Sequence, residues 1–169
     1  LFDRIERNAA AIRARDREAS EAVVRRSAEL HWRHIVEGGD PFELGTSRPL
    51  DFGHWVAHRL ESMTANRLAH GEAVSIGIAV DATVAMLEGR LDAVSRDRIV
   101  ATLASLGLPT WDAAAEDHRE LLAGLEEFRE HLGGPAGIAL PISIGASVDD
   151  ARPDVELVQR ALDRCAATT

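Results

Sequence analysis

Three histidines lie close together in the sequence, at spacings that suit one shared site. His54 and His58 are four residues apart, which places them on one face of a helix. His70 opens the next expected helix after a short connection. If that helix folds back along the first, His54 and His70 meet. Two neutral imidazoles with an oxygen ligand make a Zn²⁺-type site that keeps open positions for water or substrate.

The same residues have a simpler interpretation that this pattern leaves open. Histidines four residues apart are common on helices that bind no metal. His31 and His34 flank Trp32 and are expected to lie on the surface or to pack. His118 stands among acidic and basic neighbours, as on a solvated face, and His131 suits a helix C-terminus, where its charge favours the helix dipole.

Residues beside the histidines also have two interpretations. Gly53 and Gly71 either allow tight helix packing or capping, or let the backbone approach a metal and substrate. Phe52 and Trp55 are expected to anchor the core rather than to offer a stacking surface.

Composition excludes several classes of chemistry. The net charge is −9, which argues against nucleic acid as a partner, since binding phosphates needs clustered positive charge. All 19 basic residues are arginine, so Schiff-base chemistry by a lysine is excluded. A single cysteine, Cys165, excludes an internal disulfide and suits a reducing, cytoplasmic location.

The apolar pattern predicts an all-α domain with room for one short β-hairpin. The stretch 73–87 is interrupted by polar residues and is expected to be a buried core helix rather than a membrane span. Asp51 is expected to cap the helix that carries His54, and Asp16 or Ser20 to cap one near the start. We expect helices over 1–37 (two, or one that is broken), 51–63, 70–88, 92–106, 113–131 and 154–166, with strands inside 137–148.

Two linked motifs contain the three histidines. The first reads Arg48-Pro-Leu-Asp-Phe-Gly-His-Trp-Val-Ala-His-Arg-Leu-Glu61, and the second reads His70-Gly-Glu-Ala-Val-Ser-Ile-Gly77. Together they resemble the C-terminal domain of 3-dehydroquinate synthase and the wider sugar-phosphate cyclase superfamily. The first motif, together with the segment 127–134, is most similar to the divergent synthase-like proteins of the bacterial ebo gene cluster.

The resemblance implies a function for each motif residue. His54 and His70 match two of the family's three Zn²⁺ (or Co²⁺) ligands, and the third, a glutamate, belongs to a segment upstream of Leu1. His58 matches a histidine that contacts substrate or relays protons, and Arg48 matches an arginine on the phosphate side. In the family, an N-terminal domain holds NAD, which transiently oxidises the sugar phosphate before phosphate leaves and a carbocycle forms. We therefore expect residues 1–169 to be the metal- and substrate-binding domain of a longer protein, binding no NAD by themselves.

The chain departs from the family pattern at several substrate-reading positions. Asp51 replaces an asparagine, and Trp55 replaces a threonine. The family's lysines are absent: Arg33 or His34 lies near one of their positions, and one residue of the segment 129–131 lies near another. These changes put dehydroquinate itself in doubt as the product.

Three functional hypotheses remain. The first is a metal- and NAD-dependent cyclase or lyase that acts on a sugar phosphate, with a homodimer left open. The second is a non-catalytic descendant that keeps the fold for binding or assembly. The third is a helical metal hydrolase, which needs an acidic ligand within the chain, with Glu61, Glu72 and Asp81 as candidates.

Overall fold

The computed structural model describes residues 1–37, 49–131 and 137–168, and these form a helical domain with one β-hairpin. This confirms the fold class predicted from the sequence. In chain order the elements are α1 (Phe2–Arg13), α2 (Arg17–Glu37), the 3₁₀ turn η1 (Pro49–Asp51), α3 (His54–Met63), α4 (His70–Leu87), α5 (Ala93–Ser105), the 3₁₀ turn η2 (Ala113–Glu116), α6 (His118–His131), β1 (Ile138–Ser143), β2 (Ala146–Ala151) and α7 (Val155–Ala166).

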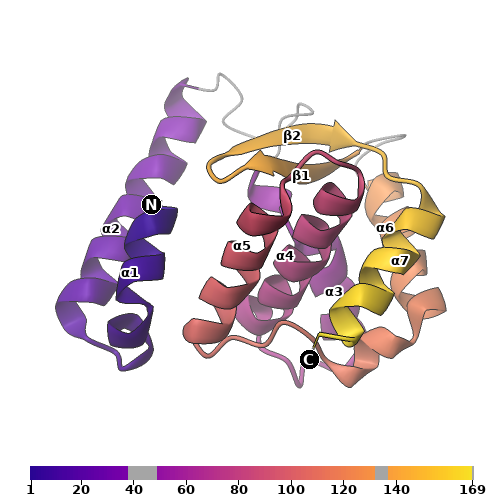
Figure 1. Cartoon of the computed structure of the whole chain (residues 1–169), viewed down its shortest axis with the longest axis horizontal. Coiled ribbons are helices and arrows are strands. Elements are labelled where there is room, and N and C mark those ends of the chain that lie inside the picture. Colours follow the sequence, from indigo (N-terminus) through magenta and orange to yellow (C-terminus); the bar gives the residue numbers. More distant parts are fainter. Residues whose placement is uncertain (38–48, 132–136, 169) are drawn as a thin grey trace.

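Helix α4 is the centre of the domain and packs against α3, α5, α7 and β1 (Figure 1). By length and composition alone it could cross a membrane, although polar residues interrupt its apolar stretch 73–87. Eleven of its eighteen residues are buried inside the protein, however. The burial identifies it as a core helix, as predicted.

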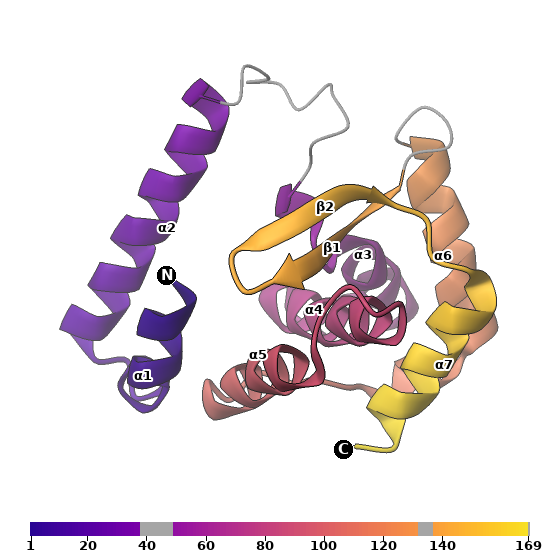
Figure 2. The same ribbon diagram turned by 45° about the horizontal axis from the view of Figure 1, so that its top comes forward.

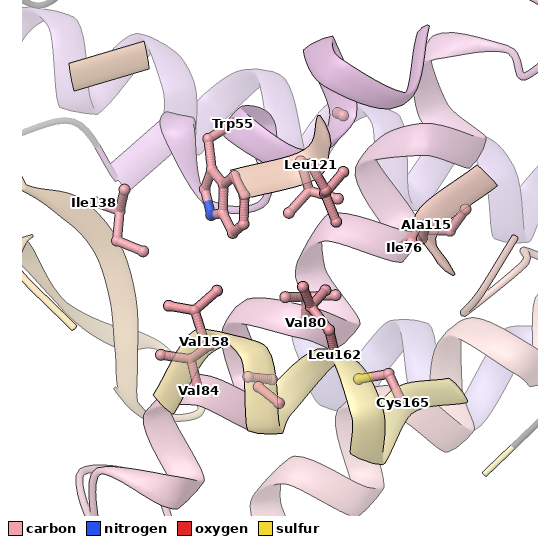
Figure 3. Packing of buried hydrophobic residues seen from close by; sticks show 14 of the residues in the cluster. Trp55, Ile76, Val80, Val84, Ala115, Leu121, Ile138, Val158, Leu162 and Cys165 are labelled. Atoms are coloured by element: carbon pink, nitrogen blue, oxygen red, sulfur yellow. The ribbon is translucent and has the colours of Figure 1, made fainter. Parts of the chain in front are cut away.

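Helix α7 closes the core on the side away from α1 and α2. Its buried residues recur at helical spacing and form one apolar stripe: Val158, Ala161, Leu162 and Cys165. Figure 3 shows this stripe facing Val80 and Val84 of α4, with Trp55 and Leu121 in the same cluster. The core therefore joins α3, α4, α6 and α7, and these elements fix the frame of the site.

Aspartates begin several helices by accepting hydrogen bonds from backbone N–H groups of the first turn. Asp16 accepts from Ala19 N at 2.8 Å, so Asp16 and not Ser20 is the cap that separates α1 from α2. The prediction for Asp51 was wrong. It ends η1, and the residue that precedes α3 is Gly53, in a left-handed conformation with φ of 80°.

The hairpin β1–β2 lies across one end of α4 (Figure 1). Its strands are antiparallel and turn at Gly145, whose φ of +96° suits a residue without a side chain. Ile138, Ala139 and Leu140 of β1 are buried, while the register carries two irregularities. This agrees with the strands predicted inside 137–148, although β2 continues to Ala151.

Helices α1 and α2 form an arm beside the rest of the domain (Figures 1 and 2). Helix α2 has 21 residues, none of them buried, and its Trp32 is 64% exposed. Helix α1 buries only Ala9 and joins the body through α5, where Arg98 pairs with Glu6 at 2.7 Å. His31 and His34 lie on this arm, on the surface or partly covered, as predicted.

The structure differs from the sequence predictions for the segment 113–131 and for His118. The segment 113–131 is not one helix, because η2 ends before α6 begins at His118. His118 does not lie on a freely solvated face, since its side chain is mostly covered and its Nδ1 is 3.7 Å from Asp163 of α7. The sequence Gly38-Gly39-Asp40-Pro41, which predicts a firm end to the helical segment 1–37, falls outside the described residues.

Candidate metal centre

The imidazole rings of His54, His58 and His70 meet at the surface between α3 and α4. The ring centres of His54 and His70 are 5.4 Å apart, and His58 lies 5.7 Å from His54 and 5.9 Å from His70. Two imidazoles bound to one tetrahedral Zn²⁺ at the usual nitrogen distance have ring centres roughly 5 Å apart. The donor set and spacing therefore fit a divalent metal of this kind.

A close approach between two glycines sets the position of His54. A Cβ added to Gly77 of α4 would lie 1.9 Å from the carbonyl oxygen of Gly53, and a Cβ on Gly53 would lie 2.7 Å from Ile78 N. Neither position can carry a side chain without moving backbone. The packing interpretation therefore holds for Gly53. It does not hold for Gly71, where a Cβ would meet nothing within 4 Å.

The buried carboxylate of Asp81 adds hydrogen bonds to the Gly53–Gly77 contact between α3 and α4. Asp81 of α4 is fully buried, and its two oxygens accept hydrogen bonds at 2.8 Å from Gly53 N and from Trp55 Nε1. These donors are the residues on either side of His54. Burial raises the pKa of Asp81 to about 7, against the opposing effect of the hydrogen bonds from Trp55 and Gly53. Trp55 is a core residue, as predicted, and Phe52 is partly exposed.

Contacts at the edge of α3 hold its outer face against α6. Arg59 lies over Gly124, where a Cβ would come within 2.7 Å of the Arg59 Cβ. The Arg59 guanidinium pairs with Glu120 and Glu127 of α6. A pocket of about 360 Å³ opens between the two helices beside His58, lined in part by Ser62 and Phe128. The histidine face thus borders a cavity.

Each of the three histidines turns its Nδ1 toward a protein oxygen. The His54 Nδ1 is 3.3 Å from the Phe52 carbonyl oxygen. The His70 Nδ1 is 3.1 Å from Glu61 Oε1, and the His58 Nδ1 is 3.4 Å from Glu61 Oε2. A carbonyl or a carboxylate only accepts, so an Nδ1 that bonds to one of these oxygens must carry the proton. In a neutral ring of that tautomer Nε2 is the bare nitrogen, which is the form that coordinates a metal.

The acidic candidates for a ligand lie in three different environments. Glu61 is beside the imidazoles. Glu72 accepts from Ala69 N at 2.9 Å and caps α4, and Asp81 lies in the core. Within the described part of the chain, ligand atoms of His58, Glu61 and His70 lie within 4.8 Å of one another. This set differs from the predicted pair His54 and His70. We favour the predicted pair, because their rings are the closest and the Nδ1 atoms of the other two histidines already face the oxygens of Glu61, at 3.1 Å for His70 and 3.4 Å for His58.

The structure describes only some of the other residues predicted for the site. Asp51 is half-buried at the end of η1, three residues before His54. Arg48 lies outside the described residues, as do the side chains of residues 129–131. Arg33 and His34 lie on α2. Sequence reasoning missed Glu61 as a partner of two histidines, although its spacing of three residues from His58 places both on one helix face.

Comparison with known proteins agrees with this architecture. Residues 1–127 match the family described as 3-dehydroquinate synthase C-terminal. The chain therefore belongs to the 3-dehydroquinate synthase C-terminal family, as its motifs indicated.

Two relatives show which enzymes of the family the chain is similar to. The chain is 33% identical over 168 residues to a 2-epi-valiolone synthase of Actinosynnema mirum, covering 97% of this chain and 44% of that protein. It is 38% identical over 133 residues to a 3-dehydroquinate synthase of Citrifermentans bemidjiense, covering 77% and 36%. The chain thus spans less than half the length of these relatives.

A solved structure shows the same fold. It is ValA, the 2-epi-5-epi-valiolone synthase of Streptomyces hygroscopicus subsp. jinggangensis, with NAD⁺ and Zn²⁺ bound. The TM-score is 0.91 at 26% identity, and the match covers all of this chain and 47% of ValA.

Proposed function

We propose that residues 1–169 are the metal- and substrate-binding domain of a sugar-phosphate cyclase. The observation that carries the proposal is the meeting of three imidazoles, each with its Nδ1 turned toward a protein oxygen. The family match, and relatives that include valiolone and dehydroquinate synthases, support the assignment. The whole protein would remove phosphate from a sugar phosphate and form a carbocycle.

In this proposal His54 and His70 hold Zn²⁺ or Co²⁺ through Nε2. The bound metal would polarise substrate oxygens and stabilise negative charge that develops on them. The two rings come from the first residues of α3 and α4, so the core that joins these helices fixes their separation. The Gly53–Gly77 contact and the Asp81 hydrogen bonds keep that separation constant.

His58 is the acid–base residue of the proposal. Its side chain is 59% exposed and stands beside the cavity between α3 and α6, so its Nε2 can reach a bound substrate. A neutral imidazole accepts a proton there and returns it to a leaving or newly formed oxygen. Arg48 would contact the phosphate through its planar guanidinium, and Asp51 would face substrate hydroxyls.

We assign the NAD of the family to residues outside this chain. A dinucleotide site of the Rossmann type needs a parallel strand, a glycine-rich turn and a helix. In the described ranges the one sheet is a two-stranded antiparallel hairpin. We propose that NAD binds an N-terminal half of the whole protein, and we assign no step that needs NAD to these residues.

Titration of the metal-free chain with Co²⁺, followed by its visible spectrum, tests the metal assignment. His54→Ala and His70→Ala should each weaken binding by at least tenfold. His31→Ala, at an exposed position on α2, should not change it. Equal affinity in all these proteins would reject the proposed ligands.

Release of inorganic phosphate from a panel of seven-carbon sugar phosphates tests the activity in the whole protein with NAD. Release that is lost in His58→Ala would support a cyclase. Metal binding without release from any member of the panel would support the non-catalytic alternative, which the absence of lysine favours.

A further inference from the structure

The carboxylate of Glu61 lies between two of the site histidines. Its Oε1 is 3.1 Å from the His70 Nδ1, and its Oε2 is 3.4 Å from the His58 Nδ1. One carboxylate thus uses a different oxygen for each imidazole. His58 is on the same helix as Glu61, whereas His70 begins α4, so Glu61 connects the two helices at their histidine faces.

Burial distinguishes Glu61 from an ordinary surface acid. Its side chain is 20% exposed, while the side chains of His58 and His70 are 59% and 54% exposed. The carboxylate is therefore the most buried group of the three. A partly dehydrated carboxylate attracts nearby N–H groups more strongly than one in water, so Glu61 can fix the orientation of both rings.

The third histidine does not depend on Glu61. The His54 Nδ1 is held by the Phe52 carbonyl oxygen at 3.3 Å, within its own segment of the chain. The site therefore contains two imidazoles oriented by one carboxylate and one imidazole oriented by the backbone.

We propose that Glu61 is a positioning residue that holds His58 and His70 as their Nδ1–H tautomers. It thereby presents the Nε2 of His70 to the metal and the Nε2 of His58 to the substrate. This inference rests on the proposed function for the roles of the two Nε2 atoms. It adds that one side chain couples the metal ligand to the acid–base residue, so that losing it impairs both.

Two substitutions separate this role from general stability. In Glu61→Ala both acceptors are lost, so His58 and His70 should move toward the Nε2–H tautomer. In Glu61→Gln one amide oxygen accepts from a single imidazole, while the amide N–H₂ can only donate to the other. One ring should then keep its tautomer and the other should switch. His54 should be unchanged in both variants and serves as the internal control.

Tautomers are measured by long-range ¹H–¹⁵N correlation spectra of the metal-free chain, labelled at histidine, at a pH where the imidazoles are neutral. The same proteins are then titrated with Co²⁺, where Glu61→Ala should bind roughly 10- to 100-fold more weakly, as is usual for a lost outer-shell partner. Glu120→Ala is the matched control, because this carboxylate pairs with Arg59 of α3 instead of a histidine.

The outcomes are distinct. Unchanged His58 and His70 tautomers in Glu61→Ala would overturn the inference, whatever the metal affinity. Abolished Co²⁺ binding with unchanged tautomers would also overturn it and make Glu61 itself a ligand. If the unsubstituted chain shows both Nδ1–H tautomers but binds no Co²⁺, the proposed function fails while the tautomer assignment stands.

Discussion

The indole Nε1 of Trp55 lies 2.8 Å from Oδ1 of Asp81, and both side chains are buried. Trp55 is the bulky residue that replaces a threonine of the family motif. Its ring lies in the core cluster with Leu121 and Ile138 (Figure 3), and the residue is 1% exposed. The substitution therefore changes how α3 is fastened to α4, directly below the site.

Replacing Trp55 with Phe should destabilise the protein by about 3 kcal/mol. The change removes a donor from a buried carboxylate oxygen and leaves a cavity where the larger ring had packed. Urea unfolding followed by circular dichroism measures the loss. Trp32→Phe, at a position that is 64% exposed on α2, is the control and should change stability by less than about 0.5 kcal/mol. Equal losses in the two variants would contradict the assigned role of the Trp55 indole.

Asp81 should make stability depend on pH. Burial raises its pKa in the folded protein to about 7, above the usual value of 3.8 for an aspartate. The folded state thus holds the proton more tightly than the unfolded state does. The contribution of Asp81 to the free energy of unfolding is greatest below pH 4, falls as pH rises toward 7 and is constant above that. The total change should be a few kcal/mol, since each pKa unit corresponds to about 1.4 kcal/mol.

Asp81→Asn provides the comparison, because an amide does not titrate. The difference in unfolding free energy between Asp81→Asn and the unsubstituted chain should move in favour of the variant between pH 4 and pH 7. A difference that is flat across this range would show that Asp81 keeps an ordinary pKa in the fold.

Gly77→Ala should weaken both folding and metal binding. The added methyl would meet the carbonyl oxygen of Gly53 at 1.9 Å, so α3 and α4 must separate and carry His54 away from His70. We expect a loss of about 3 kcal/mol, at the upper end for overpacking. Gly71→Ala lies on the same helix in open space and should leave stability equal or slightly raised, because alanine is the better helix former. A Gly77→Ala protein with unchanged Co²⁺ affinity would contradict the link between this contact and the site.

Val80→Asp should cost several kcal/mol and abolish cooperative unfolding at moderate temperature. Val80 is completely buried in α4, and a carboxylate there has no partner to offset its loss of water. The matched variant Val24→Asp introduces the same charge at a position on α2 that is 68% exposed, and its melting temperature should stay near that of the unsubstituted chain. Similar melting curves for the two variants would mean that α4 is not the core helix.

Most helices could be predicted because their signals are local. Asp16, Asp92 and Asp154 each accept from a backbone N–H of the helix they precede, and Gly89 and Gly107 follow helices with positive φ. The helical spacing of apolar residues indicated the course of each helix between these ends. Asp51 looked equally good as a cap, but the close approach of Gly53 to Gly77 starts α3 two residues later. That contact joins positions 24 residues apart and leaves no local signal.

In the site, too, some features follow from local sequence spacing and others only from tertiary packing. Spacing alone indicated that His54, His58 and His70 could meet, and the structure brings their rings together. The carboxylates were harder to assign, because Glu61 and Asp81 look alike in sequence. Only tertiary packing places Glu61 beside His70 of the next helix and Asp81 in the core.

The exposed arm has a consequence for how the molecule opens. Because none of the residues of α2 is buried and α1 contributes only the buried Ala9 and the partly buried Phe2, separating the arm from the body exposes little apolar surface compared with opening the core. Its backbone amides should therefore exchange with deuterated solvent through a partial opening, well before those of α4, which need the whole core to unfold. The histidine site lies on the slow-exchanging side of that boundary, so its ligands should keep their spacing through fluctuations that release the arm.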